Sequence, residues 1–588
     1  MTLRRMLPAA LAGFGTCGLW IAALTLEGNP ELLASGADAL VLVGWFASVY
    51  GAVGAAAALV AAIVVALIRR AAGPPRAESA ARLSVYALAV TPVAGALLLP
   101  DSGLHRTLLT NALFGGPVET ALLAAAVLAA SVIAGWSIDR LSRRLARRGL
   151  PLIVVPLGLW LVLAAWWTTR LLLVDPDEPR AAVGVTVAQP FSAARAAPRV
   201  PLVLLCIDGA DPDDALAPLI EAGKLPTFAK LKRQGVSGEL QTLYPTLSPA
   251  IWTTIATGKP PSEHGVHHFV LFDLPGLDRP IRHFPLHTGL NFRVVSSVER
   301  LPGAPAIQVP YSSNLRRARA LWEIAGERMR VGVYGWRVTW PAEEVNGFNV
   351  ATGVTLLDEL TGDEPVSGDG SGLPDDRSIY PPDALRRAAL ASPATSARPG
   401  ADTVAELLGL IAAYRPGFVA AGFYSVDAAQ HRAAREPRLP GLGLPPSVVA
   451  AYRRTDAHLG ELLAMLGGPG DFNLIVVSDH GFDFEHHHHT HAPPGIFVAR
   501  GPAFRRNRPV AGLSVYDVAP IVLYALGLPL AADMPGTASR QHRRVIRRPV
   551  RSFQVPTYEL GPAGDGRLLE PPDLEETKRR LRALGYLH

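Results

Sequence analysis

Acidic and histidine side chains occur in this chain where short hydrophobic runs end. The runs are 203–207, 418–423 and 474–477, and the side chains that follow them are Asp208, Asp427, His431, Asp479 and His480. Short apolar runs separated by helix-like stretches are typical of the strands of a mostly parallel sheet. Ligands bind beyond the carboxyl ends of such strands. We therefore expect three acids to converge on one crevice, where a metal ion would offset their mutual repulsion.

Length and composition indicate a membrane region joined to a large soluble part. The 588 residues exceed what one core can hold, so at least two domains are expected. Apolar residues make up 49% and charged residues only 18%, with the apolar excess in the first third. The formal charge of +6 is modest, and we expect no nucleic-acid partner. Cys17 and Cys206 are too few and too differently placed for a disulfide framework.

Five apolar runs in the first third are long enough to cross a bilayer, which takes roughly 20 residues each. They are 7–26, 39–68, 84–99, 118–136 and 151–173, of which the third is the shortest. Arginines gather before the first run, between the second and third, and between the fourth and fifth. By the positive-inside rule, we expect a multi-pass protein of the cytoplasmic (inner) membrane. Its N-terminus is expected in the cytoplasm, and everything after 174 is expected outside it. The alternative, buried helices of a soluble protein, conflicts with the length of the runs and their scarcity of charge.

The stretch 244–258 is a second strong signal. Ser248 is a good helix N-cap, Pro249 suits the first helical position, and the helix is expected to end at Gly258. A hydroxyl at a helix start sits in positive potential, which favours an alkoxide and an incoming phosphate. The backbone N–H groups at 249–250 are expected to hold developing charge. A lone Ser-Pro before a helix is usually only a cap, and the acidic set around it is what makes Ser248 a candidate nucleophile.

Two further patterns fit a metal site and also have plain alternatives. Asp427 and His431 are four residues apart, so on a helical turn they share one face and can bind one ion. The same spacing also suits an exposed polar pair. Asp479 and His480 precede Gly481 at a strand end, where an ordinary Asx turn is the alternative.

The order and spacing of these motifs resemble the alkaline phosphatase superfamily over roughly 200–540. The matching segments are 207–209, 245–252, 257–265, 427–431, 478–481, 515–520 and 526–528. The chain is similar to the bacterial phosphodiesterase/nucleotide-pyrophosphatase-like or phosphohydrolase/phosphomutase-like branch. The resemblance implies an α/β fold, a three-layer α/β/α sandwich with a mostly parallel sheet, beside an N-terminal all-α transmembrane bundle. The expected domains are 1–174 (membrane region of about five helices), 175–199 (linker), 200–550 (catalytic domain with a cap insertion at about 268–380) and 551–588 (an extension with a short helix).

The resemblance also implies two divalent metal ions. The mixture of aspartate and histidine ligands suits Zn²⁺, and Mn²⁺ is the alternative. One ion would be held by Asp208, Ser248, Asp479 and His480, and the other by Asp427, His431 and His491. His489 is the alternative to His491 as the last ligand, because His486 to His489 lie close by. Lys259 is a candidate for contact with a phosphate oxygen, and an exposed lysine at a helix end is the alternative.

Three departures from relatives bear on the reaction. The diesterase branch often has a threonine nucleophile followed three residues later by an asparagine that holds a phosphoryl oxygen, whereas this chain has Ser248 and Ile251. The nucleotide-pyrophosphatase branch takes a ligand from a later Gly-Thr-His, and here that stretch ends in Ala538. The residues after Ser248 also lack the sulfatase pattern.

The predicted activity is hydrolysis of a phosphoric ester, as a diesterase or monoesterase, by a membrane-anchored two-metal enzyme through a phosphoserine at Ser248. Two alternatives remain open. The first is a phosphotransferase that moves a phospho-headgroup to a lipid or glycan acceptor. The second is a non-catalytic membrane scaffold. The expected partners are a phosphate-ester substrate and the lipid bilayer.

Overall fold

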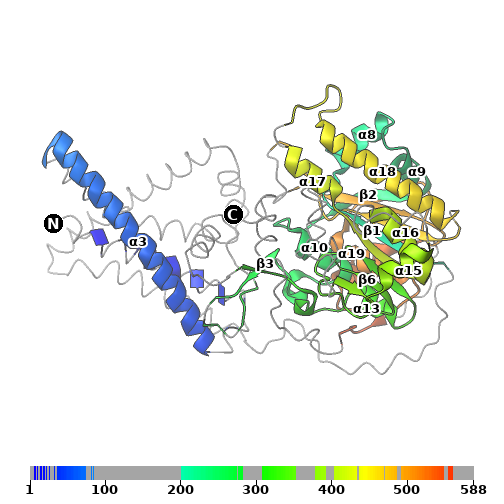
Figure 1. Ribbon diagram of the computed structural model, residues 1–588, viewed down its shortest axis with the longest axis horizontal. Coiled ribbons are helices and arrows are strands. Elements are labelled where there is room, and N and C mark those ends of the chain that lie inside the picture. The colour runs from blue at the N-terminus through cyan, green and yellow to red at the C-terminus, as the bar shows by residue number, and fades with distance from the viewer. Residues whose placement is uncertain are drawn as a thin grey trace. The chain divides into compact units, whose positions relative to one another are not determined.

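The structure is a computed structural model (Figure 1). It describes residues 36–74, 200–274, 308–351, 378–391, 403–433, 436–468, 470–485, 492–547 and 554–559, with scattered positions at 6–32, 81, 84 and 276–282. The chain divides into two compact units. One comprises 1–179 with 272–308, and the other comprises 180–271 with 309–588. Each unit is described by itself.

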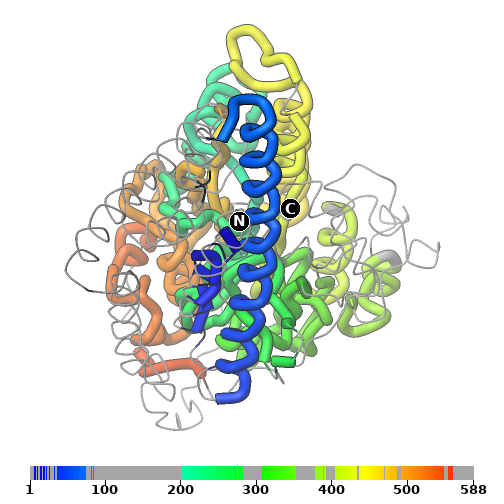
Figure 2. Tube along the Cα trace, turned by 90° about the vertical axis from the view of Figure 1, so that its left-hand side faces the viewer, coloured from blue at the N-terminus to red at the C-terminus, as the bar shows by residue number. Residues whose placement is uncertain are grey.

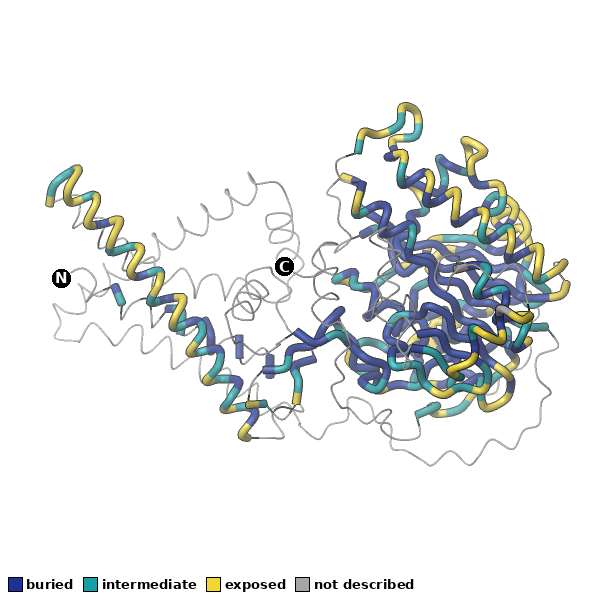
Figure 3. Tube along the Cα trace, in the orientation of Figure 1, coloured by how far each residue is buried: buried dark blue, intermediate teal, exposed yellow. Residues whose placement is uncertain are grey.

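The first unit contains α3, a helix of 37 residues spanning Gly36–Ala72. It runs unbroken from end to end (Figure 2). Apolar side chains such as Leu40, Ile63 and Leu67 are exposed along it (Figure 3). Among the described residues, α3 is the helix that is long and apolar enough to cross a membrane. It contains the second predicted run, 39–68, whereas the third, fourth and fifth runs lie outside the described residues, apart from position 84.

The second unit is built on a sheet whose order is β11-β2-β10-β9-β1-β8-β5-β6-β7, with β12 also paired to β2. The strands are β1 (Leu202–Ile207), β2 (Val236–Gln241), β5 (Val331–Tyr334), β6 (Gly347–Val350), β7 (Ile379–Tyr380), β8 (Phe418–Phe423), β9 (Asn473–Val477), β10 (Gly495–Arg500), β11 (Arg508–Pro509) and β12 (Leu513–Ser514). All run in one direction except β10 and β7, which are antiparallel to their neighbours. The sheet is therefore mostly parallel, as predicted.

Helices cover both faces of this sheet. Successive side chains of a strand point to opposite faces, so apolar strands need a helical layer on each face. On one face, Val203, Leu205 and Ile207 of β1 join a core cluster with the helices α8, α9 and α15 to α18. Their bounds are α8 (Ala217–Glu221), α9 (Pro226–Gln234), α15 (Ala384–Ala391), α16 (Thr403–Tyr414), α17 (Ser425–Arg432) and α18 (Pro446–Leu466). The helix α19 (Val515–Ala525) contacts α10 (Ser248–Thr257), α13 (Leu321–Gly326) and β1, and α13 contacts β5 and β8 (Figure 1). The result is a three-layer α/β/α sandwich.

Short elements complete the unit. They are α11 (Pro261–His264), α20 (Pro535–Ser539), α21 (His542–Val545), the pair β3 (Val270–Phe272) and β4 (Gln308–Pro310), and the pair β13 (Leu530–Ala531) and β14 (Gln554–Val555). β14 comes from the predicted C-terminal extension, and Glu559 just after it accepts a hydrogen bond from the backbone N–H of Arg319. The helix expected within 551–588 lies outside the described residues.

The range expected to form a cap, 268–380, is only partly separate from the sheet. β5, β6 and β7 lie within it and extend the sheet beyond β8. All four residues of β5 are buried, because the strand has neighbours on both sides and helices above it. A cap that takes up the whole range is therefore wrong: 331–334, 347–350 and 379–380 belong to the central sheet. Trp322 and Trp336, aromatic residues of this range, are also buried in the core.

Candidate active site

The carboxyl ends of β1, β8 and β9 bring distant acids together. Ile207 pairs with Phe423, and Cys206 pairs with Val477, so these three strands end almost level. Asp208 directly follows β1, and Asp479 lies two residues beyond β9. Both carboxylates are fully buried. The register of the strands thus brings their ends together, as the sequence predicts.

The turn after β1 admits Asp427 to the same place. Gly209 has a φ of 70°, and its N–H lies 3.3 Å from Oδ1 of Asp479. A Cβ on Gly209 would lie 2.9 Å from Oδ1 of Asp427 and 2.8 Å from Oε1 of Gln430. Only glycine combines the left-handed backbone with this close approach of α17. Asp208, Asp427 and Asp479 therefore lie around one turn and not on separate faces.

Ser248 is the first residue of α10, and its hydroxyl does not cap that helix. Its Oγ lies 3.2 Å from Nε2 of His480 and 3.4 Å from Oδ1 of Asp208. The side chain is fully buried. The plain alternative for Ser248, a helix cap, is therefore wrong, because the hydroxyl faces the acids and not the N–H groups of its own helix. The prediction for 249–250 also fails, since Pro249 has no N–H and Ala250 donates to the carbonyl of Leu247 at 3.0 Å.

Asp208, Asp479 and His480 form a group suited to a metal ion, with one ligand atom of each within 4.8 Å of the others. Nδ1 of His480 lies 2.7 Å from the carbonyl oxygen of Gly481. A carbonyl can only accept, so Nδ1 carries the proton and Nε2 offers a lone pair to the site. The buried Oδ2 of Asp479 receives no hydrogen bond from the described residues. This donor set fits a divalent cation.

Asp427 and His431 share one face of α17, as their spacing predicts. Nε2 of His431 lies 3.5 Å from Oδ1 of Asp427, and its ring packs edge-on against Phe482. Both His491 and His489 lie outside the described residues. The next residue, Ala492, donates its N–H to Oγ1 of Thr246 at 3.2 Å. The residue after His491 is thus hydrogen-bonded to Thr246, which lies two positions before Ser248 in the sequence.

Electrostatics at the site reflect acids that are crowded together and buried. Burial, together with the neighbouring carboxylate of Asp479, raises the pKa of Asp208 to about 8. Burial alone would lower the pKa of His480, but the carboxylates of Asp479 and Asp208 raise it overall. Burial lowers the pKa of His431, against an opposing effect of Asp427. Negative charge here needs cations, which a metal can provide.

Lys259 is neither exposed nor directed to these acids. Its ammonium lies 2.5 Å from Oδ2 of Asp533, 3.3 Å from the Asp533 carbonyl and 3.2 Å from Oε2 of Glu263. These three acceptors match the three donors of an ammonium. The lysine is also almost fully buried. The structure thus gives the Lys259 side chain a structural ion pair, and the expectation of an exposed lysine is wrong.

Arg337 is the site residue that the sequence did not reveal. It follows β5, and its Nη2 donates to Oδ2 of Asp208 at 2.8 Å. Its guanidinium lies over the ring of Tyr424, 4.4 Å from the centroid. The expectation of a cap over 268–380 hides this residue, because the strand that precedes Arg337 belongs to the sheet.

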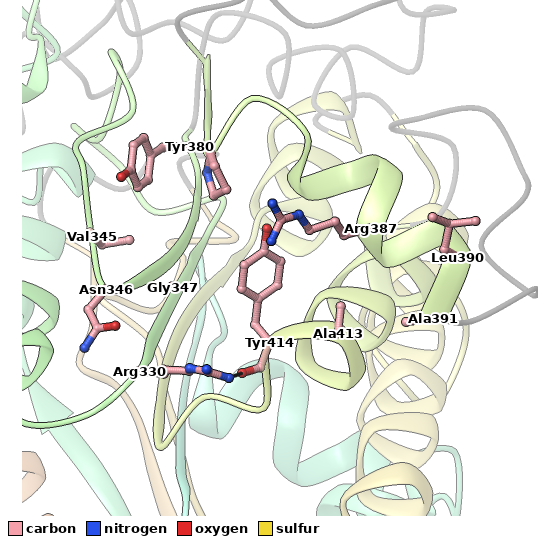
Figure 4. Close-up of a pocket in the computed structure, with 11 residues that line it drawn as sticks. Arg330, Val345, Asn346, Gly347, Tyr380, Arg387, Leu390, Ala391, Ala413 and Tyr414 are labelled. Carbon is pink, nitrogen blue, oxygen red and sulfur yellow. Dashed lines mark hydrogen bonds between the residues drawn. The ribbon is translucent and has the colours of Figure 1, made fainter.

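A pocket of about 690 Å³ lies at the other end of the strands (Figure 4). Its lining includes Arg330, which precedes β5, Gly347, which starts β6, and Tyr414, which precedes β8. These strands are parallel, so the pocket opens at their amino ends, whereas Asp208 and Asp479 lie at the carboxyl ends. This pocket is therefore separate from the candidate active site.

Comparison with family models identifies one family. Residues 202–508 match the family model of type I phosphodiesterase/nucleotide pyrophosphatase. No curated protein matches the chain. One similar solved structure is phosphonoacetate hydrolase from Sinorhizobium meliloti 1021, in complexes with phosphonoformate and with phosphonoacetate, at 20% identity and a TM-score of 0.29. The match covers 48% of this chain and 57% of that hydrolase, so the chain spans little more than half of its length. Another is human ectonucleotide pyrophosphatase/phosphodiesterase 5, at 15% identity and a TM-score of 0.35, covering 59% of this chain and 99% of that one.

Proposed function

The chain belongs to the type I phosphodiesterase/nucleotide pyrophosphatase family, within the alkaline phosphatase superfamily; from this premise we propose that it is a phosphoric-ester hydrolase that is membrane-anchored, metal-dependent and works through a phosphoserine at Ser248. The observation that carries the proposal is the direction of the Ser248 hydroxyl. The hydroxyl faces Asp208 and His480 at a helix start, where a nucleophile can be activated. A hydroxyl that only capped the helix would instead face the backbone N–H groups.

The residues that would hold the metals divide into two groups. Asp208, Asp479 and His480, with Ser248, would hold one divalent ion. Asp427 and His431 would hold the second, together with His491 or, as the alternative, His489. The carboxylate and imidazole donors suit Zn²⁺, with Mn²⁺ the alternative. When bound, such ions supply positive charge that lowers the pKa of a coordinated hydroxyl and of water.

Within that frame, the chain's own residues divide the work as follows. Ser248 Oγ attacks phosphorus, so that the Oγ–P bond forms as the ester P–O bond breaks and the alcohol leaves. Water then breaks the Oγ–P bond, which restores Ser248 and releases phosphate when the substrate is a monoester or a phosphate monoester when it is a diester. His480, held by its Nδ1–H on Gly481, keeps Nε2 turned toward Oγ throughout. Asp427 and His431 stand on a rigid helix on the other side of the Gly209 turn.

The test uses the full chain in detergent with an aryl phosphate ester. We expect Ser248→Ala and Asp479→Ala each to lower kcat/KM by at least about 1,000-fold, because each removes a part of one catalytic unit. Metal analysis is the second readout, with about two ions per wild-type chain and fewer in Asp479→Ala. Asp383→Ala, which removes an exposed carboxylate paired with Arg387, is the matched control.

Retained activity in both site variants would exclude this mechanism. A wild-type chain without metal and without activity would favour the scaffold alternative. Transfer of the phosphoryl group to an added lipid or glycan acceptor, in place of release as phosphate, would favour the phosphotransferase.

A further inference from the structure

We propose that Arg337 is a specificity-determining residue that favours a dianionic phosphoryl group, so that phosphate monoesters are preferred over diesters. This rests on the proposed function and names its substrate class. Nη2 of Arg337 donates to Oδ2 of Asp208 at 2.8 Å, while Oδ1 of the same carboxylate lies 3.4 Å from Ser248 Oγ. A single carboxylate therefore separates the guanidinium from the nucleophile.

The guanidinium is held in place from several sides. Besides Asp208, it lies 4.4 Å from the centroid of the Tyr424 ring and 5.5 Å from that of Phe269, in cation–π geometry. Its side chain is only 10% exposed. A charge in such a position is little screened by water, so it acts on a nearby anion although the carboxylate of Asp208 offsets part of it.

The loop that carries Arg337 adopts an unusual backbone. Gly335 and Val338, on either side, have φ values of 61° and 59°. A β-branched residue rarely adopts this left-handed region, so the surrounding structure must impose it. Tyr424 contributes, because its hydroxyl donates to the carbonyl of Gly335. The residue beneath the guanidinium thus also fixes the turn that presents it.

Other expected holders of phosphoryl charge are engaged elsewhere or lack polar atoms. Ala250 donates its N–H to Leu247, and Lys259 is taken up by Asp533 and Glu263. Ile251, at the position where diesterase relatives often have an asparagine, has an apolar side chain. Among the described residues, Arg337 is therefore the arginine or lysine whose cation lies against Asp208, the acid nearest Ser248.

The preference follows from charge. Coulomb energy scales with the product of the charges, so a fixed guanidinium attracts a dianionic monoester twice as strongly as a monoanionic diester at the same distance. Within several ångströms and at an intermediate dielectric constant, one unit of charge changes relative binding by roughly 10- to 100-fold. Removing the charge should lower monoester turnover by about that factor more than diester turnover.

The experiment measures kcat/KM of the full chain for 4-nitrophenyl phosphate and bis(4-nitrophenyl) phosphate at about pH 8, above the second pKa of phosphate monoesters of about 6. We expect Arg337→Met to lower the monoester-to-diester ratio roughly 10- to 100-fold and Arg337→Lys to restore much of it. Arg330→Met, at the other end of the same strand, is the control that leaves the ratio unchanged. Calorimetric binding of inorganic phosphate should weaken in Arg337→Met, while its metal content stays equal to the wild type.

An equal fall for both esters would overturn the proposal, because Arg337 would then only hold Asp208. Loss of metal from Arg337→Met would overturn it too, since the metal site would then account for the change. If the wild type cleaves neither ester, the proposed function fails, and the role of Arg337 is then tested only by calorimetric binding of inorganic phosphate. In that case, an unchanged phosphate affinity in Arg337→Met would reject a phosphoryl-binding role for Arg337.

Discussion

At the scale of single residues, His264 shows how this fold depends on a neutral imidazole. The side chain is fully buried, its Nδ1 accepts from the N–H of Val266 at 3.2 Å, and its Nε2 lies 3.0 Å from Oγ1 of Thr254 on α10. Since Nδ1 accepts, Nε2 carries the proton and donates to Thr254. Burial and the nearby charge of Arg316 lower the pKa of His264 to about 3 from an ordinary 6.5.

This lowered pKa makes the free energy of unfolding depend on pH. Between pH 6.5 and about 3 the unfolded chain binds a proton at His264 that the folded chain does not, so the free energy of unfolding falls as pH falls through that window. The slope is about 1.4 kcal/mol per pH unit for one proton. We expect His264→Gln to flatten the dependence in urea unfolding between pH 6.5 and 4. The half-buried His458→Gln is the control, and an unchanged slope in the His264 variant would contradict the prediction.

Residues that act through local spacing could be foreseen. Asp427 and His431 share a helical face because four residues make about one turn, and Asp208 lies at a strand end because an apolar run stops there. Arg337 could not be foreseen, because its partner, Asp208, is 129 positions away along the chain. An arginine after an apolar run has no local pattern that marks it as a site residue. The burial of Lys259 could not be foreseen for the same reason, since its partner Asp533 is also distant.

At the scale of elements, the position of α10 depends on a glycine in the neighbouring strand. A Cβ on Gly422 of β8 would lie 2.5 Å from Cζ3 of Trp252, which is fully buried on α10. Trp252 is one turn beyond Ser248, so both residues lie on the same side of the helix. We expect Gly422→Ala to cost about 1–3 kcal/mol in unfolding free energy and to lower kcat by displacing Ser248. Urea unfolding and turnover of an aryl ester would measure both effects.

A glycine without such a neighbour provides the comparison. At Gly326, the last residue of α13, the nearest atom to an added Cβ is 3.8 Å away, an ordinary contact. Gly326→Ala should leave turnover unchanged and stability equal or slightly higher. If both variants behave alike, α10 does not depend on Gly422.

The elements were easier to predict than their arrangement. The runs around 203–207, 418–423 and 474–477 became strands, and the helix after Ser248 ends at Gly258, because period and turn residues are local signals. The place of β5 beside β8 depends on long-range pairing, which no window of sequence contains. That is why the local sequence predicts a cap where a segment of the sheet lies.

At the scale of the whole molecule, the sequence predicts a catalytic part outside the cytoplasm. α3 is long enough to span a bilayer, and the arginine pattern of the first 174 residues predicts the orientation. We expect a fluorescent reporter that matures only in the cytoplasm to stay dark when fused after His588 and to fluoresce when fused before Met1. Bright C-terminal fusions, or release of the chain by alkaline carbonate, would contradict this topology.

The direction of β10 has a consequence for how such a site can change. Because β10 runs opposite to β9, the connection between them leaves and returns at one rim, where Gly481 donates its N–H to the carbonyl of Pro493. Insertions or deletions between these two anchors can therefore alter that rim while every strand keeps its partners. A different histidine of this connection could therefore take over as a metal ligand without any change in the pairing of the strands.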